Sequence, residues 1–196
     1  MTTRKAQVKR ETKETNIDVD LCLDGAGEYS INTGVGFLDH MLELFSKHGF
    51  FNLKISAKGD LHVDEHHTVE DIGIVLGGAF KKALGDCSGI ARYGFSVVPM
   101  DESLGQVTVD ISGRPCLEYR IKCRKRKSGS FDLQMIEEFF RAFAVKAEIT
   151  IHIESPYGVN AHHVYESVFK AFGRAMDIAT SIEPRRKGIP SSKGIL

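Results

Sequence analysis

The runs His66-His67-Thr68-Val69-Glu70 and His162-His163-Val164-Tyr165-Glu166 repeat one pattern, HHxxE, 96 positions apart in a chain of 196 residues. In a helix the Glu follows the two His by three and four residues, so its carboxylate projects between the imidazoles. The adjacent His side chains diverge by about 100° and cannot easily bind one ion together. Each copy therefore offers two ligand pairs that share a carboxylate, and we expect two facing copies to complete two metal sites.

An ordinary surface or core histidine would explain one copy of the motif about as well. Repetition of the motif, together with the apolar helix pattern that follows it, argues against that interpretation. The pattern also differs from the HExxH of zinc proteases, in which two His bind one zinc. A donor set of His and carboxylates without cysteine suits Mn, Fe or Zn, and manganese most when carboxylates and six-coordination dominate.

The residues around the two motifs repeat one order of elements, three strands, a helix, a strand and a helix. Alternation and helical spacing of apolar residues place these elements as follows. Strands are expected near 6–11, 15–23, up to Asn32, 51–55, 91–99, 107–111, 116–123 and 149–153, and helices near 36–47, 65–84, 132–146 and 161–181. Each half would form a four-stranded sheet covered on one face by two helices. We therefore expect an α/β (α+β) fold of two internally duplicated half-domains, about 6–88 and 91–182, whose two sheets enclose four helices, followed by a C-terminal substrate-binding tail.

Corresponding helices of the two halves carry a further pair of candidate metal ligands. His40 lies 26 residues before His66, and Glu138 lies 24 residues before His162. Either side chain could instead be an ordinary polar residue, partly buried for His40 and solvated for Glu138. Together with the motifs they extend the duplicated half-site.

Bulk properties exclude several classes of protein. The formal net charge is zero and the pI is near 7.1, so nothing in the composition favours nucleic acid or an anionic membrane. No stretch approaches the roughly 20 apolar residues of a membrane span, and the N-terminal residues lack the apolar run of a secretory signal. Four cysteines without a CxxC pattern indicate reduced thiols and a cytoplasmic protein. The basic run 120–127 is interpreted as a solvated or subunit-contact loop, since no aromatic platform for nucleic acid accompanies it.

Three separate segments have the composition of an anion site. They are Arg92 before Tyr93-Gly94, Arg114 after Gly113, and the tail that holds Ser191, Ser192 and Lys193. Arginine forks onto phosphate oxygens, Ser and Lys add donors, and glycine allows close backbone approach. Each segment alone would be read as surface charge, so the prediction depends on their combination with the metal motifs.

Taken together, these segments resemble the imidazoleglycerol-phosphate dehydratase family of histidine biosynthesis, in its monofunctional form. The resemblance covers residues about 6 to 196 in order, through RETKET (10–15), TGVGFLDHML (33–42), GDLHVDEHHTVED (59–71), RYG (92–94), DISGRP (110–115), NAHH (160–163) with Glu166 and Phe169-Lys170-Ala171, and PSSKG (190–194). It implies a hydro-lyase that removes water from imidazole glycerol phosphate to give imidazole acetol phosphate.

The resemblance also implies a set of roles. It implies two Mn ions per subunit, held by His40, His66, His67, Glu70, His162, His163 and Glu166, and a 24-subunit homo-oligomer. It implies proton transfer by Glu14 and Glu166, and Lys170 shares a helix face with Glu166 at i,i+4. Many members carry His at the position of Glu138, so this ligand is carried over only as a candidate. A dinuclear phosphoesterase and a metal-assembled non-catalytic oligomer are the alternatives left open.

Overall fold

A computed structural model describes residues 3–123 and 125–196. The first half forms a sheet of order β1-β2-β4-β3, antiparallel except between β3 and β4. Its elements are β1 (Lys5–Glu11), β2 (Thr15–Cys22), β3 (Tyr29–Asn32), α1 (Gly36–His48), β4 (Asn52–Gly59) and α2 (His66–Leu84). Alternate residues of its central strands, such as Ile17, Val19 and Leu53, are fully buried. This alternation turns one face of the sheet toward the core.

The second half forms a sheet with the corresponding order, β5-β6-β10-β7, again with one parallel pair, β7 and β10. Its elements are β5 (Tyr93–Met100), β6 (Ser103–Asp110), β7 (Cys116–Ile121), α3 (Gln134–Ala147), β10 (Thr150–Ser155) and α4 (Ala161–Thr180). A small hairpin of β8 (Lys127–Ser128) and β9 (Phe131–Asp132) precedes α3. The prediction of two four-stranded sheets with two helices each is confirmed.

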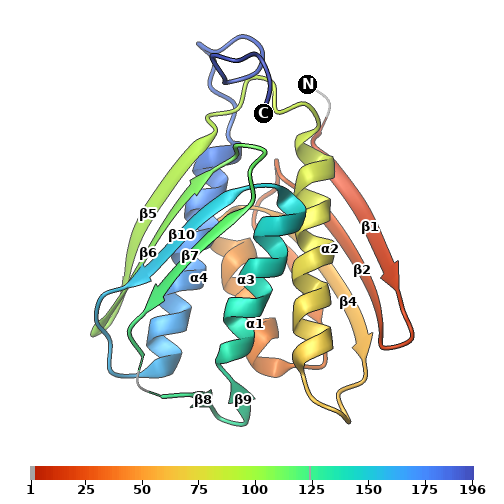
Figure 1. The fold of residues 1–196 in the computed structure, drawn as a ribbon, viewed down its shortest axis with the longest axis vertical. Helices are drawn as coiled ribbons and strands as arrows, with labels where there is room; N and C mark the ends of the chain where they lie inside the picture. Colours follow the sequence, from red (N-terminus) through yellow and green to blue (C-terminus); the bar gives the residue numbers. More distant parts are fainter. Residues whose placement is uncertain (1–2, 124) are drawn as a thin grey trace.

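The four helices lie between the two sheets, as Figure 1 shows. Helix α2 packs on α3, and α1 packs on α4. Glycines allow both contacts: a Cβ on Gly77 would lie 2.6 Å from the carbonyl oxygen of Phe143, and one on Gly173 would lie 2.5 Å from that of Phe45. Both glycines lie eleven residues after the first His of their motif. The two helix contacts therefore repeat each other, as expected of duplicated halves.

Two details differ from the sequence-based expectation. Strand β6 begins at Ser103, earlier than expected, because Met100 and Ser103 pair across a tight turn with β5. The β8–β9 hairpin was not expected, since two-residue strands carry no periodic signal. The basic run 120–127 covers the end of β7, the following loop and the start of β8, and its Arg124 lies outside the described residues.

No helix in the described part of the chain combines the length and apolar character that crossing a bilayer requires.

Candidate metal centre and anion-binding end

Both HHxxE motifs open a helix, and they open it at the same end of the molecule. Helix α2 begins at His66 and α4 at Ala161, and both helices start at the lower end in Figure 1. In each motif the backbone N–H of the first His donates to a side chain two residues earlier, His66 to Asp64 at 2.8 Å and His162 to Asn160 at 3.0 Å. Asp and Asn favour helix starts because their oxygens accept such otherwise unpaired N–H groups. These local hydrogen bonds thus help to fix where both helices begin.

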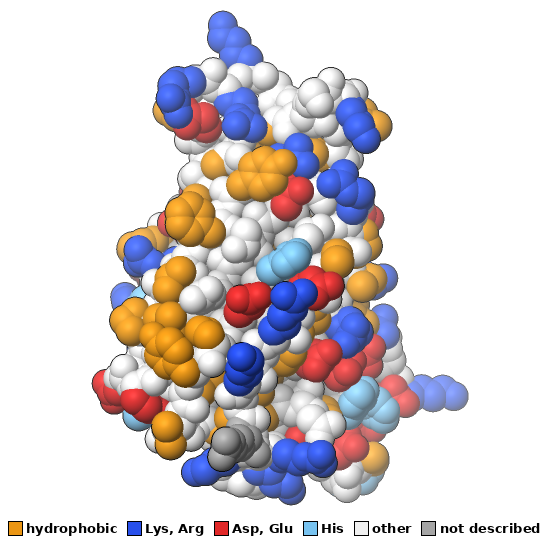
Figure 2. Space-filling model, turned by 60° about the vertical axis from the view of Figure 1, so that its left-hand side comes forward, with side chains coloured by type: hydrophobic (Ala, Val, Ile, Leu, Met, Phe, Trp, Pro, Cys, Tyr) orange, Lys and Arg blue, Asp and Glu red, His pale blue; other side chains and the backbone are white. Residues whose placement is uncertain are grey.

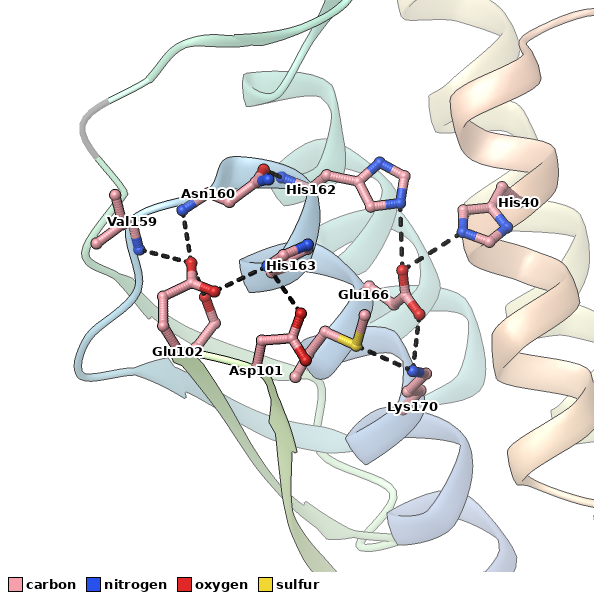
Figure 3. A network of polar contacts seen from close by, with 11 residues as sticks. His40, Asp101, Glu102, Val159, Asn160, His162, His163, Glu166 and Lys170 are labelled. Carbon is pink, nitrogen blue, oxygen red and sulfur yellow. Dashed lines mark hydrogen bonds and ion pairs between the residues drawn. The ribbon is translucent and has the colours of Figure 1, made fainter.

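Helix α1, packed on α4, brings His40 to the second motif. The Nε2 atoms of His162 and His40 lie 3.2 and 3.6 Å from Oε2 of Glu166, and Figure 3 shows both rings turned toward this carboxylate. One donor atom from each residue lies within 4.8 Å of the others. Metal–nitrogen bonds of about 2.1 Å place two donors of one ion at most about 4.2 Å apart. The two His–Glu pairs fit this limit, and two imidazoles with one carboxylate suit Mn, Fe or Zn.

Glu166 also contacts a lysine one helical turn further along α4. Lys170 Nζ lies 2.7 Å from Oε1 of Glu166, which agrees with the predicted i,i+4 placement of Lys170 on the same side. Burial pushes the pKa of Glu166 upward, but the Lys170 ammonium and the His40 imidazole outweigh burial, so the pKa lies below its usual value. The Glu166 carboxylate is therefore held in its ionised form, in which it can bind a metal ion or accept a proton.

The first motif forms a smaller group. His66 Nε2 lies 3.6 Å from Oε2 of Glu70, and the rings of His66 and His67 are 6.0 Å apart and nearly perpendicular. This divergence agrees with the expected angle between neighbouring His side chains on a helix. Glu138 carries an ion pair with Arg141 at 3.6 Å. Within residues 3–123 and 125–196, a three-residue donor group forms at His40, His162 and Glu166 and not around His66 and Glu70.

The second His of each motif is held by a carboxylate that lies outside the motif. His67 Nδ1 lies 3.0 Å from Asp60, and His163 Nδ1 lies 2.8 Å from Glu102. These hydrogen bonds raise the pKa of His67 and of His163 above the usual value. Sequence reasoning missed both carboxylates. Asp60 lies only seven residues before His67, so its proximity in sequence was a weak indication, whereas Glu102 comes from a distant hairpin.

Glu14 lies at the tip of the β1–β2 hairpin, exposed to solvent. Its charge contributes to the raised pKa of His67, which places the Glu14 carboxylate at the same end of the molecule as the first motif. The fold therefore gathers Glu14 with His66, His67 and Glu70, and Glu166 with His40, His162 and Lys170.

The predicted anion segments come together as well, at the opposite end. Arg92 donates to Asp110 at 2.7 Å and, through Nη1, to the carbonyl oxygen of Pro190 at 2.8 Å, so it ties the tail to the sheet. The guanidinium of Arg114 lies 3.9 Å from Asp110 and is largely exposed. A Cβ on Gly113 would lie 2.5 Å from the last residue, Leu196. Ser191, Ser192 and Lys193 continue directly from the anchored Pro190.

Helix α4 separates the two ends. His162 lies in its first turn, whereas the backbone N–H of Arg92 donates to the carbonyl oxygen of Ala179 near its end. A rise of 1.5 Å per residue over this interval gives about 25 Å. Figure 1 shows the tail and the helix starts at opposite ends of the molecule. Within one chain, the metal-type and anion-type groups are therefore too far apart to contact one small molecule.

Comparison with known proteins identifies relatives over almost the whole chain. Residues 33–176 match the family model of imidazoleglycerol-phosphate dehydratase. The imidazoleglycerol-phosphate dehydratase of Caldanaerobacter subterraneus subsp. tengcongensis is 57% identical over 193 residues, 98% of this chain and 100% of the relative. That of Bacillus pumilus is 56% identical over the same shares of both chains.

Solved structures agree with these relatives. The Staphylococcus aureus imidazoleglycerol-phosphate dehydratase superposes with a TM-score of 0.80 at 43% identity, covering 91% of this chain and 99% of that one. The Pyrococcus furiosus enzyme, solved in complex with (S)-C348, gives a TM-score of 0.81 at 36% identity, covering 96% and 99%. On these grounds, the chain belongs to the imidazoleglycerol-phosphate dehydratase family.

Proposed function

We propose that this chain is a metal-dependent hydro-lyase that converts imidazole glycerol phosphate to imidazole acetol phosphate in histidine biosynthesis. The observation that carries the proposal is the cluster of His40, His162 and Glu166 beside Lys170, in a member of this family. The cluster combines a metal donor set with a carboxylate that is also paired with an ammonium. A metal-assembled protein without catalysis would not need that pairing.

The proposed centre holds two Mn ions per subunit. His40, His162 and Glu166 would bind one ion, and His66 with Glu70 would begin the second. His67 and His163 expose Nε2 for further coordination, because their Nδ1 atoms are taken by carboxylates. Glu138 is a candidate ligand on α3, the helix that packs on α2 as α1 packs on α4. When bound, such ions would act as Lewis acids that polarise the imidazole ring of the substrate.

Protein side chains would move the protons. We assign proton transfer to Glu14 and Glu166, since elimination of water must remove a proton from carbon and give one to the leaving hydroxyl. Lys170, 2.7 Å from Glu166, would keep this carboxylate ionised until it accepts a proton. Among the described residues, the structure gives the Glu14 carboxylate no hydrogen-bond or ion-pair partner, which leaves it free to reach a substrate.

The other end of the molecule would hold the substrate phosphate. We assign this role to Arg92, Arg114, Ser191, Ser192 and Lys193, whose donors suit a phosphate ester. Because this end lies about 25 Å from the metal ligands along α4, a complete site requires a second copy of the chain. A homo-oligomer is therefore part of the proposal, and the family resemblance implies 24 subunits.

One face of the molecule supports such an assembly. Tyr93, Phe95 and Val97 alternate along β5 and are 57%, 71% and 56% exposed. Figure 2 shows hydrophobic side chains gathered on the side of the molecule where β5 forms the sheet edge. Exposed apolar surface of this kind is typical of a face that another protein covers. We propose another copy of the chain as that partner, and neither nucleic acid nor a membrane.

Two further assignments complete the proposal. We regard about 6–88 and 91–182 as two pseudo-repeats of a single domain, with the C-terminal tail as a substrate-binding segment. This is supported by the matching strand orders and by the corresponding glycines of α2 and α4. All four cysteines are free thiols, which fits a reducing compartment such as the cytoplasm.

A turnover assay tests the function. Metal-stripped protein reloaded with Mn²⁺ should consume imidazole glycerol phosphate, followed by ultraviolet absorbance of the product, and should leave a general phosphatase substrate intact. Release of phosphate from either compound would support the phosphoesterase alternative. Mn²⁺ binding without any turnover would support the non-catalytic oligomer.

A further inference from the structure

The second His of each motif contacts a carboxylate through the same ring nitrogen. Asp60 approaches Nδ1 of His67, and Glu102 approaches Nδ1 of His163, as Figure 3 shows for the second pair. A carboxylate only accepts hydrogen bonds, so a neutral ring must place its proton on Nδ1 and its lone pair on Nε2. Among the described residues, the first His of each motif has no carboxylate at Nδ1 and faces the motif's own Glu through Nε2.

We infer that Asp60 and Glu102 are positioning residues that hold His67 and His163 as Nε2 donors for a divalent metal ion. This inference rests on the metal assignment proposed above. A carboxylate behind a ligating imidazole fixes the tautomer and the ring orientation and raises the basicity of the donor nitrogen. Both rings point away from the His–Glu pair of their own motif, so the motif's Glu does not fix their orientation. An outside carboxylate is therefore needed to hold these two rings in place for a metal ion.

The two halves reach this arrangement by different routes. Glu14 and Glu102 occupy corresponding hairpin tips, since each is the first residue past the midpoint of its strand pair, β1–β2 and β5–β6. In the second half the hairpin carboxylate, Glu102, contacts His163. In the first half His67 is contacted by Asp60, which directly follows β4. Glu14 therefore does not position a His, which agrees with the proton-transfer role proposed for it.

One oxygen of Asp60 adds nothing to the stability of the fold, since the contact with His67 uses the other oxygen. Its Oδ1 atom is buried and has no hydrogen-bond partner within the described residues. A buried acceptor without a partner costs free energy. Glu102, by contrast, also accepts from the backbone N–H groups of Val159 and Asn160, at 3.1 and 2.7 Å. A substitution at Asp60 should therefore disturb the fold less than one at Glu102, and it tests the positioning role more directly.

The test measures Mn²⁺ binding to the full-length, metal-stripped protein, with the free ion followed by electron paramagnetic resonance. Asp60→Ala should weaken binding by about 10- to 100-fold, the usual effect of losing a carboxylate behind a metal-bound His. The unfolding temperature of the metal-free protein should change little, because the loss of the His67 hydrogen bond is offset by removal of the buried unpaired oxygen. If Asp60→Ala does not fold, Asp60→Asn keeps the size of the side chain and should also weaken binding.

Asp64→Ala is the matched control. Asp64 lies in the same loop and accepts from the backbone N–H of His66, whereas the hydrogen-bond partner of the His67 ring is Asp60. The charge of Asp64 is the smallest of the causes that raise the pKa of His67, so its loss should lower the unfolding temperature and leave Mn²⁺ affinity within a few-fold of wild type. Glu102→Gln keeps an oxygen for the two backbone donors and should weaken Mn²⁺ binding as Asp60→Ala does. Wild-type affinity in both Asp60→Ala and Glu102→Gln would overturn the inference.

His67→Ala distinguishes this failure from failure of the metal assignment. If His67→Ala loses affinity while Asp60→Ala does not, the positioning role alone is wrong. If all of these variants bind Mn²⁺ like wild type, His67 is not a metal ligand and both proposals fail.

Discussion

A mixing experiment tests whether one site draws its two ends from different chains. Glu14 lies at the end of the molecule that holds the proposed metal ligands, and Arg114 lies at the end that holds the proposed phosphate donors. The helix between these ends spans about 25 Å. If one active site needs both residues, they come from two different subunits. Mixing Glu14→Gln chains with Arg114→Ala chains in one oligomer should then restore activity.

The expected magnitudes follow from the two roles. Arg114→Ala removes one charge-assisted phosphate contact, worth about 1.5–3 kcal/mol, and should raise the Michaelis constant roughly ten- to a hundredfold. Glu14→Gln should lower turnover by about 10²–10⁴. Equal random mixing leaves about one quarter of sites, each shared between two subunits, with wild-type residues at both positions. At low substrate concentration the mixed oligomer should therefore reach about a quarter of wild-type activity, above either variant alone.

The assay needs co-expressed chains that carry two different affinity tags, so that mixed oligomers are isolated by sequential purification. Activity is measured per chain at substrate concentrations well below the wild-type Michaelis constant. The control is a mixture of wild-type chains with the Glu14→Gln/Arg114→Ala double variant, which tests for subunit exchange and tag effects. Activity equal to the mean of the two separate variants would refute the shared site, because it would mean that each site uses both residues of one chain.

Four further outcomes are expected. Glu14→Gln should keep wild-type metal content, measured on the preparation used for its turnover rate, and a loss of metal would instead make Glu14 a ligand. His67→Ala should abolish turnover and lower the metal content below two ions per chain, by elemental analysis of loaded protein. Because its pKa is raised, His67 keeps its proton at a higher pH than an ordinary His, so Mn²⁺ affinity should already fall on acidification from above pH 6.5, and a midpoint well below that value would contradict this. Gly173→Ala should lower the free energy of unfolding by about 1–3 kcal/mol, since its Cβ would lie 2.5 Å from the carbonyl oxygen of Phe45, and it should weaken Mn²⁺ binding by displacing His40.

Several features could be predicted from the sequence because they depend on local order along the chain. The HHxxE repeat, the apolar spacing after each motif and the alternation in strands such as β2 repeat over a few residues, and a helix or strand responds directly to that period. The fold, the motif helices and the i,i+4 pair of Glu166 with Lys170 followed from these patterns. The family followed from the combination of motifs in their order.

The partners of each imidazole were decided by tertiary structure. His40 reaches Glu166 because Gly173 lets α1 approach α4 closely, and Asp60 and Glu102 reach their His from a loop and a distant hairpin. No short-range pattern records such contacts, since they depend on how separate elements pack. The same is true of the placement of the anion segments at the far end of α4. The sequence shows which residues suit a phosphate, but the length of a helix sets their distance from the candidate metal ligands.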